Sequence, residues 1–290
     1  MSATTIWLGV LQFASLALVL ALLYRPLGDW MYRVYTAGKY WRLERGVYRL
    51  IGVDSRAEQT WQGYLRGVLA FSVMGVLFVY ALQRFQAVLP YSLGLPAVPE
   101  GLAFNTAASF VSNTNWQSYS PELTMGYIVQ LAGLTVQNFV SGAVGIAIAI
   151  ALVRGFARRG SATIGNFWVD LTRGLTRILV PIATITGGTQ TIPGGPVASQ
   201  EVIKLLGTNG GGFFNTNSAH PFENPTPWTN LFQMLLILVI PVALPRTFGR
   251  MVGDNRQGYA ILAVMSTLAI ASIAAVTWLE AAGNGTAPQL

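Results

Sequence analysis

Long apolar stretches constrain this chain more than any other feature of its sequence. Ile6–Tyr24 holds 19 residues without a charge, and Met125–Val153 holds 29. Because about 20 apolar residues cross the hydrocarbon core of a bilayer, each stretch predicts a membrane-spanning helix. Ile6–Tyr24 is too long for a signal-peptide core and lacks an A-x-A cleavage pattern, which favours a retained span. Further spans are predicted at Gly67–Phe85, at Leu231–Pro245 with room for extension back to Pro227, and at Tyr259–Leu279.

The charged residues are few and unevenly placed. They make up 10% of the chain, against about 25% in a soluble domain. Sixteen of the 18 Lys and Arg residues lie in or beside segments 25–66, 154–177 and 246–256; Arg84 and Lys204 are the exceptions. The positive-inside rule places these three segments in the cytoplasm and the polar segments between them outside. Topology therefore explains the basic residues, and no nucleic-acid partner is expected.

The fourth apolar stretch is short. Only Gly174–Thr186 is clearly apolar, and Asp170, Arg173 and Arg177 share one helical face at and before its start. Either these charged turns project into the cytoplasm from a spanning helix, or the segment does not cross; residues 164–186 leave both readings open. Asp170 is expected to cap this helix or to pair with Arg173.

Three landmarks recur at a spacing of about 97 residues. Gln62–Tyr64 and Gln257–Tyr259 are both Q-G-Y, two periods apart, each before an apolar span. Ser112–Thr114 lies 96 residues before Thr208–Gly210, and each follows a short apolar helix. An Arg-x-Phe tripeptide closes the span after each loop. A repeat predicts that the fourth stretch crosses, because otherwise the two polar loops would face opposite sides.

The predicted fold is an all-α polytopic membrane protein of about six transmembrane helices, built from span–pore loop–span repeats with re-entrant pore helices at 102–111 and 199–207. The predicted divisions are an extra N-terminal span with a basic cytoplasmic loop (1–61), a first unit (62–159), a second unit (160–256), and the first span of a third, incomplete unit (257–290).

The two polar loops predict a cation site. Ser112–Gln117 and Leu206–Asn217 (LGTNGGGFFNTN) offer neutral oxygens and glycine backbone, and neither holds a carboxylate. A phosphate loop would need Gly-Lys-Ser/Thr after its glycines, whereas Phe213 follows here. Backbone carbonyls and neutral side-chain oxygens can replace the hydration shell of a cation, and hard divalent ions favour carboxylates. We therefore expect potassium, with an ordinary surface turn as the structural alternative.

Several long motifs resemble the potassium-binding A subunit of the bacterial Kdp potassium-transporting ATPase, a member of the superfamily of potassium transporters with four span–pore–span units. The motifs are Asn113–Tyr119 (NTNWQSY), Leu134–Phe139 (LTVQNF), Gly195–Glu201 (GPVASQE), Gly207–Asn215 (GTNGGGFFN), Ser218–Asn224 (SAHPFEN) and Arg256–Gly258.

The resemblance implies a K⁺ selectivity filter with the residues Asn113, Thr114, Asn115, Gln117, Thr208, Asn209, Gly210 and Gly211. It also implies location in the bacterial cytoplasmic (inner) membrane and no catalysis by this chain. ATP and Mg²⁺ would bind only the partner P-type ATPase B subunit, with small C and F subunits in the complex. No D-K-T-G phosphorylation motif occurs here, as that division of labour requires.

The sequence departs from the family pattern in two places. Ile185–Pro193 is shorter than the corresponding family segment, and the chain is expected to end inside the third unit. Third and fourth units, in cis or in trans, would then be needed to complete the filter. Three hypotheses follow: a K⁺-translocating subunit of an ATP-driven uptake complex, a passive two-unit channel that dimerises, and an assembly fragment.

A few single residues also invite interpretation. His220 is expected to pack within its loop, and Glu201 to form an ion pair with Lys204. The aromatic residues beside the loops (Trp116, Phe213 and Phe214) are expected to brace them. The polar residues inside the third span (Gln130, Gln137 and Asn138) fit helix packing and pore lining equally.

Overall fold

The computed structural model describes residues 3–158, 160–186, 197–215 and 217–281, and the regular secondary structure of this part of the chain is helical apart from one pair of short strands. The elements are α1 (Ala3–Thr36), α2 (Arg42–Leu50), β1 (Gln59–Thr60), α3 (Trp61–Arg84), the 3₁₀ turn η1 (Gln86–Val88), α4 (Glu100–Val111), α5 (Pro121–Thr124), the π-helical η2 (Val129–Thr135), α6 (Val136–Ala157), β2 (Thr163–Gly165), α7 (Phe167–Arg173), the π-helical η3 (Gly174–Leu179), α8 (Val180–Thr186), α9 (Val197–Leu206), α10 (Pro227–Val252) and α11 (Asn255–Ala281).

Five of the described helical segments are long and apolar enough to cross a membrane: Trp7–Thr36, Trp61–Arg84, Val129–Ala157, Pro227–Val252 and Asn255–Leu279. This confirms an all-α polytopic membrane protein. The first span is longer than predicted, because α1 continues through Pro26 to Thr36. The span predicted at Leu231–Pro245 begins at Pro227, where the Thr226 side chain accepts a hydrogen bond from the first turn and caps the helix.

The fourth stretch is helical from Phe167 to Thr186 but does not meet the same criterion of length and hydropathy, so five such spans are found where about six were predicted. The charged first turns of this stretch are covered by other parts of the chain. Asp170, Arg173 and Arg177 are only 1%, 4% and 5% exposed. Asp170 is bound by Arg154 of α6, Arg173 by the Ala37 carbonyl between α1 and α2, and Arg177 by Glu44 of α2, so the charges are buried within protein.

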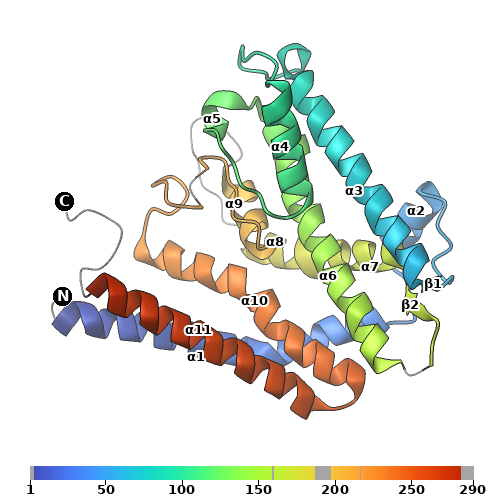
Figure 1. The fold of residues 1–290 in the computed structure, drawn as a ribbon, viewed down its shortest axis with the longest axis vertical. Coiled ribbons are helices and arrows are strands. Elements are labelled where there is room, and N and C mark those ends of the chain that lie inside the picture. The colour runs from blue at the N-terminus through green and yellow to red at the C-terminus, as the bar shows by residue number, and fades with distance from the viewer. Residues whose placement is uncertain (1–2, 159, 187–196, 216, 282–290) are drawn as a thin grey trace.

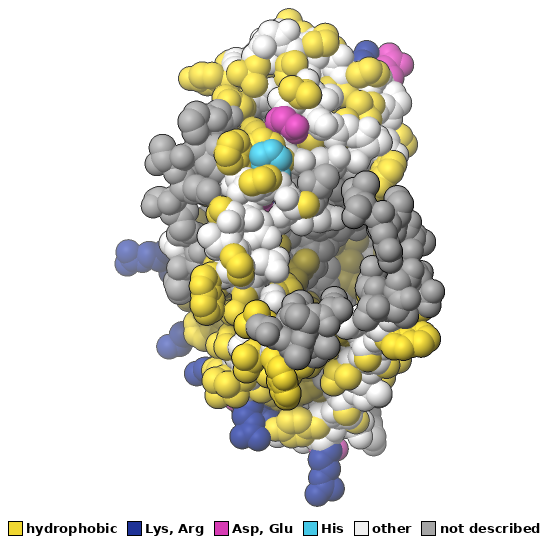
Figure 2. All heavy atoms as spheres, turned by 90° about the vertical axis from the view of Figure 1, so that its left-hand side faces the viewer, with side chains coloured by type: hydrophobic (Ala, Val, Ile, Leu, Met, Phe, Trp, Pro, Cys, Tyr) yellow, Lys and Arg dark blue, Asp and Glu magenta, His cyan; other side chains and the backbone are white. Residues whose placement is uncertain are grey.

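The long helices form two groups with α6 between them. Figure 1 shows α1, α10 and α11 side by side, while α3 and α4 pack together on the other side of α6. In the most apolar part of Val129–Ala157, which joins η2 to α6, 44% of the residues are buried, against none in the corresponding part of α11. The span that contains α6 is therefore the central one. Figure 2 shows Lys and Arg side chains gathered on the lower part of one face, below a mainly apolar and neutral upper part. This agrees with the charge asymmetry of the sequence.

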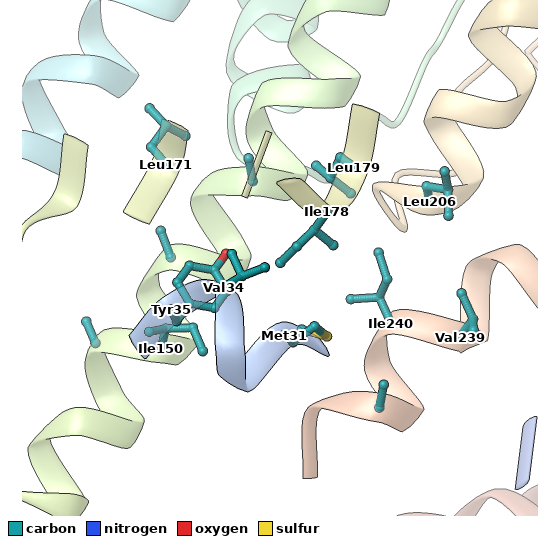
Figure 3. Close-up of a cluster of buried hydrophobic side chains, with 14 of the residues drawn as sticks. Met31, Val34, Tyr35, Ile150, Leu171, Ile178, Leu179, Leu206, Val239 and Ile240 are labelled. Carbon is teal, nitrogen blue, oxygen red and sulfur yellow. The ribbon is translucent and has the colours of Figure 1, made fainter. Parts of the chain in front are cut away.

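The main hydrophobic core lies where α1, α6, α7 with η3, the end of α9, and α10 converge (Figure 3). Met31 and Ile178 at its centre are fully buried. Burying a side chain of this size contributes about 1.5–3 kcal/mol relative to exposing it. The core thus fixes α9, which carries one polar loop, against α6.

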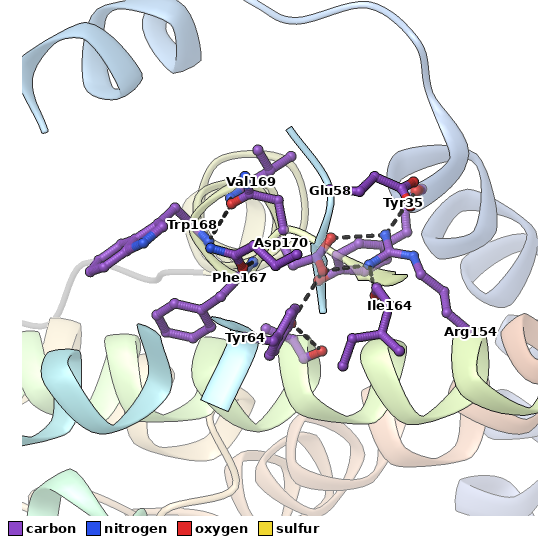
Figure 4. A network of polar contacts seen from close by, with 12 residues as sticks. Tyr35, Glu58, Tyr64, Arg154, Ile164, Phe167, Trp168, Val169 and Asp170 are labelled. Atoms are coloured by element: carbon purple, nitrogen blue, oxygen red, sulfur yellow. Dashed lines mark hydrogen bonds and ion pairs between the residues drawn. The ribbon is translucent and has the colours of Figure 1, made fainter. Parts of the chain in front are cut away.

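A buried polar network ties four helices together at the basic end (Figure 4). The Arg154 guanidinium at the end of α6 pairs with Asp170 of α7, with Nη2 2.9 Å from Oδ1. The Tyr64 hydroxyl of α3 donates to Asp170 Oδ2 at 3.1 Å, and Arg154 Nη2 donates to the Tyr35 carbonyl at 3.3 Å. Asp170 was predicted to cap the helix or to pair with Arg173. Asn166 caps α7 instead, and Asp170 pairs with Arg154, because the guanidinium of α6 reaches it from a neighbouring helix.

The basic stretch after α1 is folded onto the same end. β1 pairs antiparallel with β2, and the carboxylate of Glu44 on α2 binds the Arg177 guanidinium. Arg177 Nη2 also donates to the Lys39 carbonyl at 2.9 Å. Burial alone would raise the pKa of Glu44, but the hydrogen-bonded Arg177 holds that pKa below its usual value. Glu44 therefore stays ionised in this contact.

Candidate functional site

The two polar loops follow short helices that end in the same way. After α4 and α9, the first two loop N–H groups donate back to helix carbonyls three and five residues earlier, at 3.0–3.3 Å and 2.9–3.0 Å respectively. This is the Schellman arrangement, whose C′ residue adopts a left-handed conformation. Asn113 (φ +66°) and Thr208 (φ +56°) hold that position. The structurally equivalent residues are thus 95 apart, one fewer than the predicted pairing of Asn113 with Asn209.

Both loops keep unusual backbone beyond the helix end. Asn115 (φ +53°) and Gly210 (φ +93°) also have positive φ, two residues after Asn113 and Thr208. A non-glycine residue in this region costs about 1–3 kcal/mol and persists only where its surroundings hold it. Thr208 is β-branched, which makes the conformation costlier still. Such strain is concentrated at functional sites, which makes these two loops candidates for one.

The two loops touch each other. Asn113 Nδ2 donates to the Gly207 carbonyl at 3.1 Å, and the Asn209 amide donates to Asn113 Oδ1. Gln117 Oε1 accepts the Gly212 N–H at 3.1 Å. A Cβ at Gly211 would lie 2.5 Å from the Asn115 carbonyl oxygen. The loops are therefore in direct contact, and a side chain at Gly211 would force them apart.

Helix α6 holds both loops in place. The Ser141 hydroxyl donates to Asn113 Oδ1 at 2.8 Å and accepts from Asn209 Nδ2 at 3.3 Å. A Cβ at Gly142 would lie 2.8 Å from the Gly207 Cα, so glycine is needed for α6 to approach so closely. Ser141 and Gly142 were not predicted as site residues. Their only sequence signal was a small polar residue in an uncharged span.

Several amide groups at this junction have no hydrogen-bond partner among the described residues. Both side-chain polar atoms of Asn115, which is 2% exposed, are unpaired, and so is Asn209 Oδ1. Both polar atoms of Asn138, one turn before Ser141 on α6, are also buried without a partner. Buried polar groups are rarely left unpaired unless water or an ion meets them. Neutral oxygens suit a monovalent cation, and the described residues contain no His/Cys/Asp/Glu cluster suited to a transition metal or Ca²⁺.

The structure does not bring all eight predicted filter residues together. Asn113, Asn115, Gln117, Asn209 and Gly211 lie in the contact between the loops. The Thr114 and Thr208 side chains are exposed and bond locally, to the Ser112 hydroxyl and the Gly207 carbonyl. Gly210 is half-buried; a Cβ there would lie 2.8 Å from Asn217 Oδ1.

A buried charged cluster lies directly behind the second loop. Lys204 is fully buried, with Nζ 2.7 Å from Glu201 Oε2 and 3.3 Å from Glu223 Oε2. The predicted Glu201–Lys204 pair is confirmed, and Glu223 adds a second carboxylate that accepts the Phe214 N–H at 3.3 Å. Two carboxylates against one ammonium leave a formal charge of −1 beside Gly212, which favours a cation in the adjoining loop.

Some of the aromatic residues beside the loops pack against them, and one is exposed. Phe213 is buried and packs edge-on against Phe214. His220 stacks on Phe214 at 4.1 Å between ring centroids, which confirms its predicted role in loop packing. The prediction that Trp116 braces the first loop is wrong, since its side chain is 61% exposed. Its neighbours Asn115 and Gln117 turn inward, so the residue between them faces out.

The comparisons with known proteins agree with the resemblance of the motifs. A family model described as the potassium-transporting ATPase A subunit matches residues 14–187 and 182–289. The two matched segments overlap at residues 182–187, which include the start of Ile185–Pro193, the stretch expected to be abbreviated. Most of that stretch lies outside the described residues, and so does Gly195 of the GPVASQE motif.

Three curated relatives are named potassium-transporting ATPase potassium-binding subunit. The chain is 66% identical over 303 residues to the protein of Clavibacter sepedonicus, covering 97% of this chain and 54% of that one. It is 56% identical over 314 residues to the protein of Mycolicibacterium smegmatis (99% and 56%), and 57% over 304 residues to that of Streptomyces coelicolor (97% and 55%). The chain spans about half the length of the curated relatives it matches.

Proposed function

This chain belongs to the family of potassium-transporting ATPase A subunits, and on that premise we propose that it binds K⁺ and carries it across the membrane as the potassium-binding part of an ATP-driven uptake complex. The observation that carries this proposal is the junction of the two loops. Two similarly ended helices deliver neutral, strained and partly unpaired loops to one place on α6. Carbonyl and amide oxygens there would take over the hydration shell of the ion.

The filter would use groups from both loops. The carbonyls and amides of Asn113 and Asn115 would serve from the first loop, and those of Asn209, Gly210 and Gly211 from the second. We propose that Gln117 positions the second loop through Gly212 and that the exposed Thr114 and Thr208 lie at the rim. The unpaired Asn115 and the negative cluster around Lys204 support cation binding at this place.

We further propose that residues 62–159 and 160–256 form two span–pore–span units whose re-entrant helices are α4 and α9, after an extra span in 1–61 and before the first span of a third unit in 257–290. The 95-residue equivalence of the helix ends supports the repeat. The basic end would face the cytoplasm of a bacterial inner membrane and the loops the outside. Third and fourth units, in cis or in trans, would complete the coordination.

Energy would come from a separate subunit. We propose that ATP and Mg²⁺ bind a P-type ATPase B subunit, and that small C and F subunits complete the assembly. The test is K⁺ uptake by cells lacking their own transporters. Uptake is expected only when the ATPase subunit is expressed with this chain and able to hydrolyse ATP. K⁺ conduction by the purified chain alone in liposomes would contradict the proposal and favour a passive channel. If the chain did not bind K⁺ even with all partners present, the hypothesis of a non-transporting assembly fragment would be favoured.

Gly210→Asp is expected to weaken discrimination of K⁺ over Na⁺. Aspartate tolerates left-handed backbone better than most residues, so the main change is a carboxylate within a neutral carbonyl site. A compact negative group favours the smaller ion more than neutral oxygens do. The measurement is the ratio of K⁺ to Na⁺ uptake at equal concentrations. Gly253→Asp is the control, because Gly253 also has positive φ (+79°) but has nothing within 4 Å of its Cβ position. Equal K⁺/Na⁺ ratios in both variants would remove this loop from the filter.

Ser141→Ala should lower the apparent K⁺ affinity by about tenfold. The substitution removes two hydrogen bonds to the asparagines of the two loops, each contributing about 0.5–1.5 kcal/mol. The measurement is the K⁺ concentration at half-maximal uptake. Ser15→Ala on α1 is the control, since its hydroxyl bonds only to the Gln12 carbonyl of its own helix at 2.8 Å. An affinity in Ser141→Ala that matches the control would show that α6 does not position the loops.

A further inference from the structure

A polar cavity lies at the basic end of the molecule, away from the two loops. It has a volume of about 430 Å³, within the usual range for small-ligand sites. The ends of α1 and α6, the start of α7 and the chain after α1 form its walls; Figure 4 shows part of them. It shares no residue with the two loops. Its charged lining residues are Arg56, Glu58, Arg154, Arg158, Asp170 and Arg173.

The charges lining this cavity do not balance. Arg154 pairs with Asp170, and Arg158 Nη1 lies 2.7 Å from Glu58 Oε2. These two pairs use both carboxylates of the lining. Arg56 and Arg173 are left without a carboxylate partner within the described part of the chain. Two guanidinium groups without an ion-pair partner among the described residues therefore line one cavity, whose lining holds four arginines against two carboxylates.

Arg173 is held as a binding group would be. Its side chain is 4% exposed, and Nη2 is fixed by donation to the Ala37 carbonyl at 2.6 Å. The guanidinium lies 5.1 Å from the centroid of the Tyr40 ring, which limits its rotation. Its Nε is buried without a hydrogen-bond partner among the described residues. Leaving such a charged donor unpaired is costly, which favours an anion at this guanidinium.

We propose that this cavity binds a phosphate-bearing anion through Arg173 and Arg56. A phosphate group carries several acceptor oxygens and one to two negative charges. Two of its oxygens can accept hydrogen bonds from one planar guanidinium group at the same time, which a monatomic anion cannot do. The cavity opens at the ends of spanning helices, where lipid headgroups lie. In the orientation proposed above, it also faces the cytoplasm, where soluble phosphates occur. The headgroup of an anionic phospholipid and free phosphate are the two sources of this chemistry.

The test is phosphate binding by the full chain purified in detergent, followed as the rise in unfolding temperature with inorganic phosphate at constant ionic strength. Saturable binding is expected. Arg173→Gln should weaken it by tenfold or more, because charge-assisted hydrogen bonds are lost. Arg56 is exposed, so Arg56→Gln should fold normally and still weaken binding about threefold. Arg49→Gln, which removes an exposed arginine outside the cavity, should change binding less than twofold.

Equal phosphate affinity in Arg56→Gln and Arg49→Gln would overturn the proposal even if Arg173→Gln failed to fold. So would the absence of saturable phosphate binding. Soluble short-chain phosphatidylglycerol is then compared with phosphate. Tighter binding of the lipid, lost in Arg56→Gln, supports the site and assigns it to a headgroup; equal binding supports it and assigns it to free phosphate. Equal competition by zwitterionic phosphatidylcholine would contradict recognition by charge. This test measures phosphate binding and not K⁺ uptake. A failure of the phosphate proposal can therefore be told apart from a failure of the proposed transport function.

Discussion

Gly211→Ala should lower the apparent K⁺ affinity by about 5- to 150-fold. The added Cβ would lie 2.5 Å from the Asn115 carbonyl oxygen and 2.8 Å from the Asn115 Cβ. Backbone cannot yield as a flexible side chain does, so the loops must separate. Overpacking of this kind costs about 1–3 kcal/mol. If it destabilises the ion-bound form of the loops by that amount, the apparent K⁺ affinity falls by the 5- to 150-fold given above. The measurement is the K⁺ dependence of uptake in the assembled complex.

Gly145→Ala provides the matched control for this experiment. Gly145 lies on α6, one turn beyond the residues that hold the loops, and nothing lies within 4 Å of its Cβ position. The same methyl group added there should leave K⁺ affinity within twofold. If Gly211→Ala behaved like Gly145→Ala, the contact between the two loops would have no part in ion binding.

Asp170→Asn should destabilise the protein by about 3–5 kcal/mol. The change leaves the Arg154 guanidinium, which is 7% exposed, without its counter-charge at the junction of α1, α3, α6 and α7. Removing one partner of a buried ion pair has an effect of this size because a buried charge is left uncompensated. The measurement is the free energy of unfolding in detergent, followed by circular dichroism.

The exposed ion pair nearby provides the comparison. Glu58→Gln breaks its pair with Arg158, whose side chains are 45% and 37% exposed. Surface pairs contribute about 0–1 kcal/mol, so this variant should be close to the parent. Replacing both members of the buried pair, Asp170→Leu with Arg154→Met, should recover part of the loss. Equal unfolding free energies for Asp170→Asn and Glu58→Gln would contradict the structural role assigned to the network.

Residues whose pattern is local were predicted well. Five apolar stretches became spanning helices, and the two short helices before the loops form at 100–111 and 197–206. The i, i+3 spacing of Glu201 and Lys204 was enough to predict their ion pair. These features depend on hydropathy and helical periodicity, which a sequence carries without reference to distant residues.

Features set by distant contacts were not predictable in the same way. Asp170 was expected to cap its helix or to pair with Arg173 three residues away, but Arg154 reaches it from another helix. The one-residue difference between the predicted and observed loop equivalence arises from where α4 and α9 end. Ser141 gave no signal beyond its small size and polarity. In each case the local sequence allowed more than one partner, helix end or role, and contacts with distant residues determined which one formed.

The central claim is that the loops after α4 and α9 together hold K⁺. The most direct test is a structure of the assembled complex in Rb⁺, a K⁺ surrogate, measured at the rubidium absorption edge. The account predicts an anomalous peak in contact with oxygens of both Asn113–Asn115 and Thr208–Gly210. If the only Rb⁺ peaks lay away from both loops, the claim that the loops hold K⁺ would be contradicted.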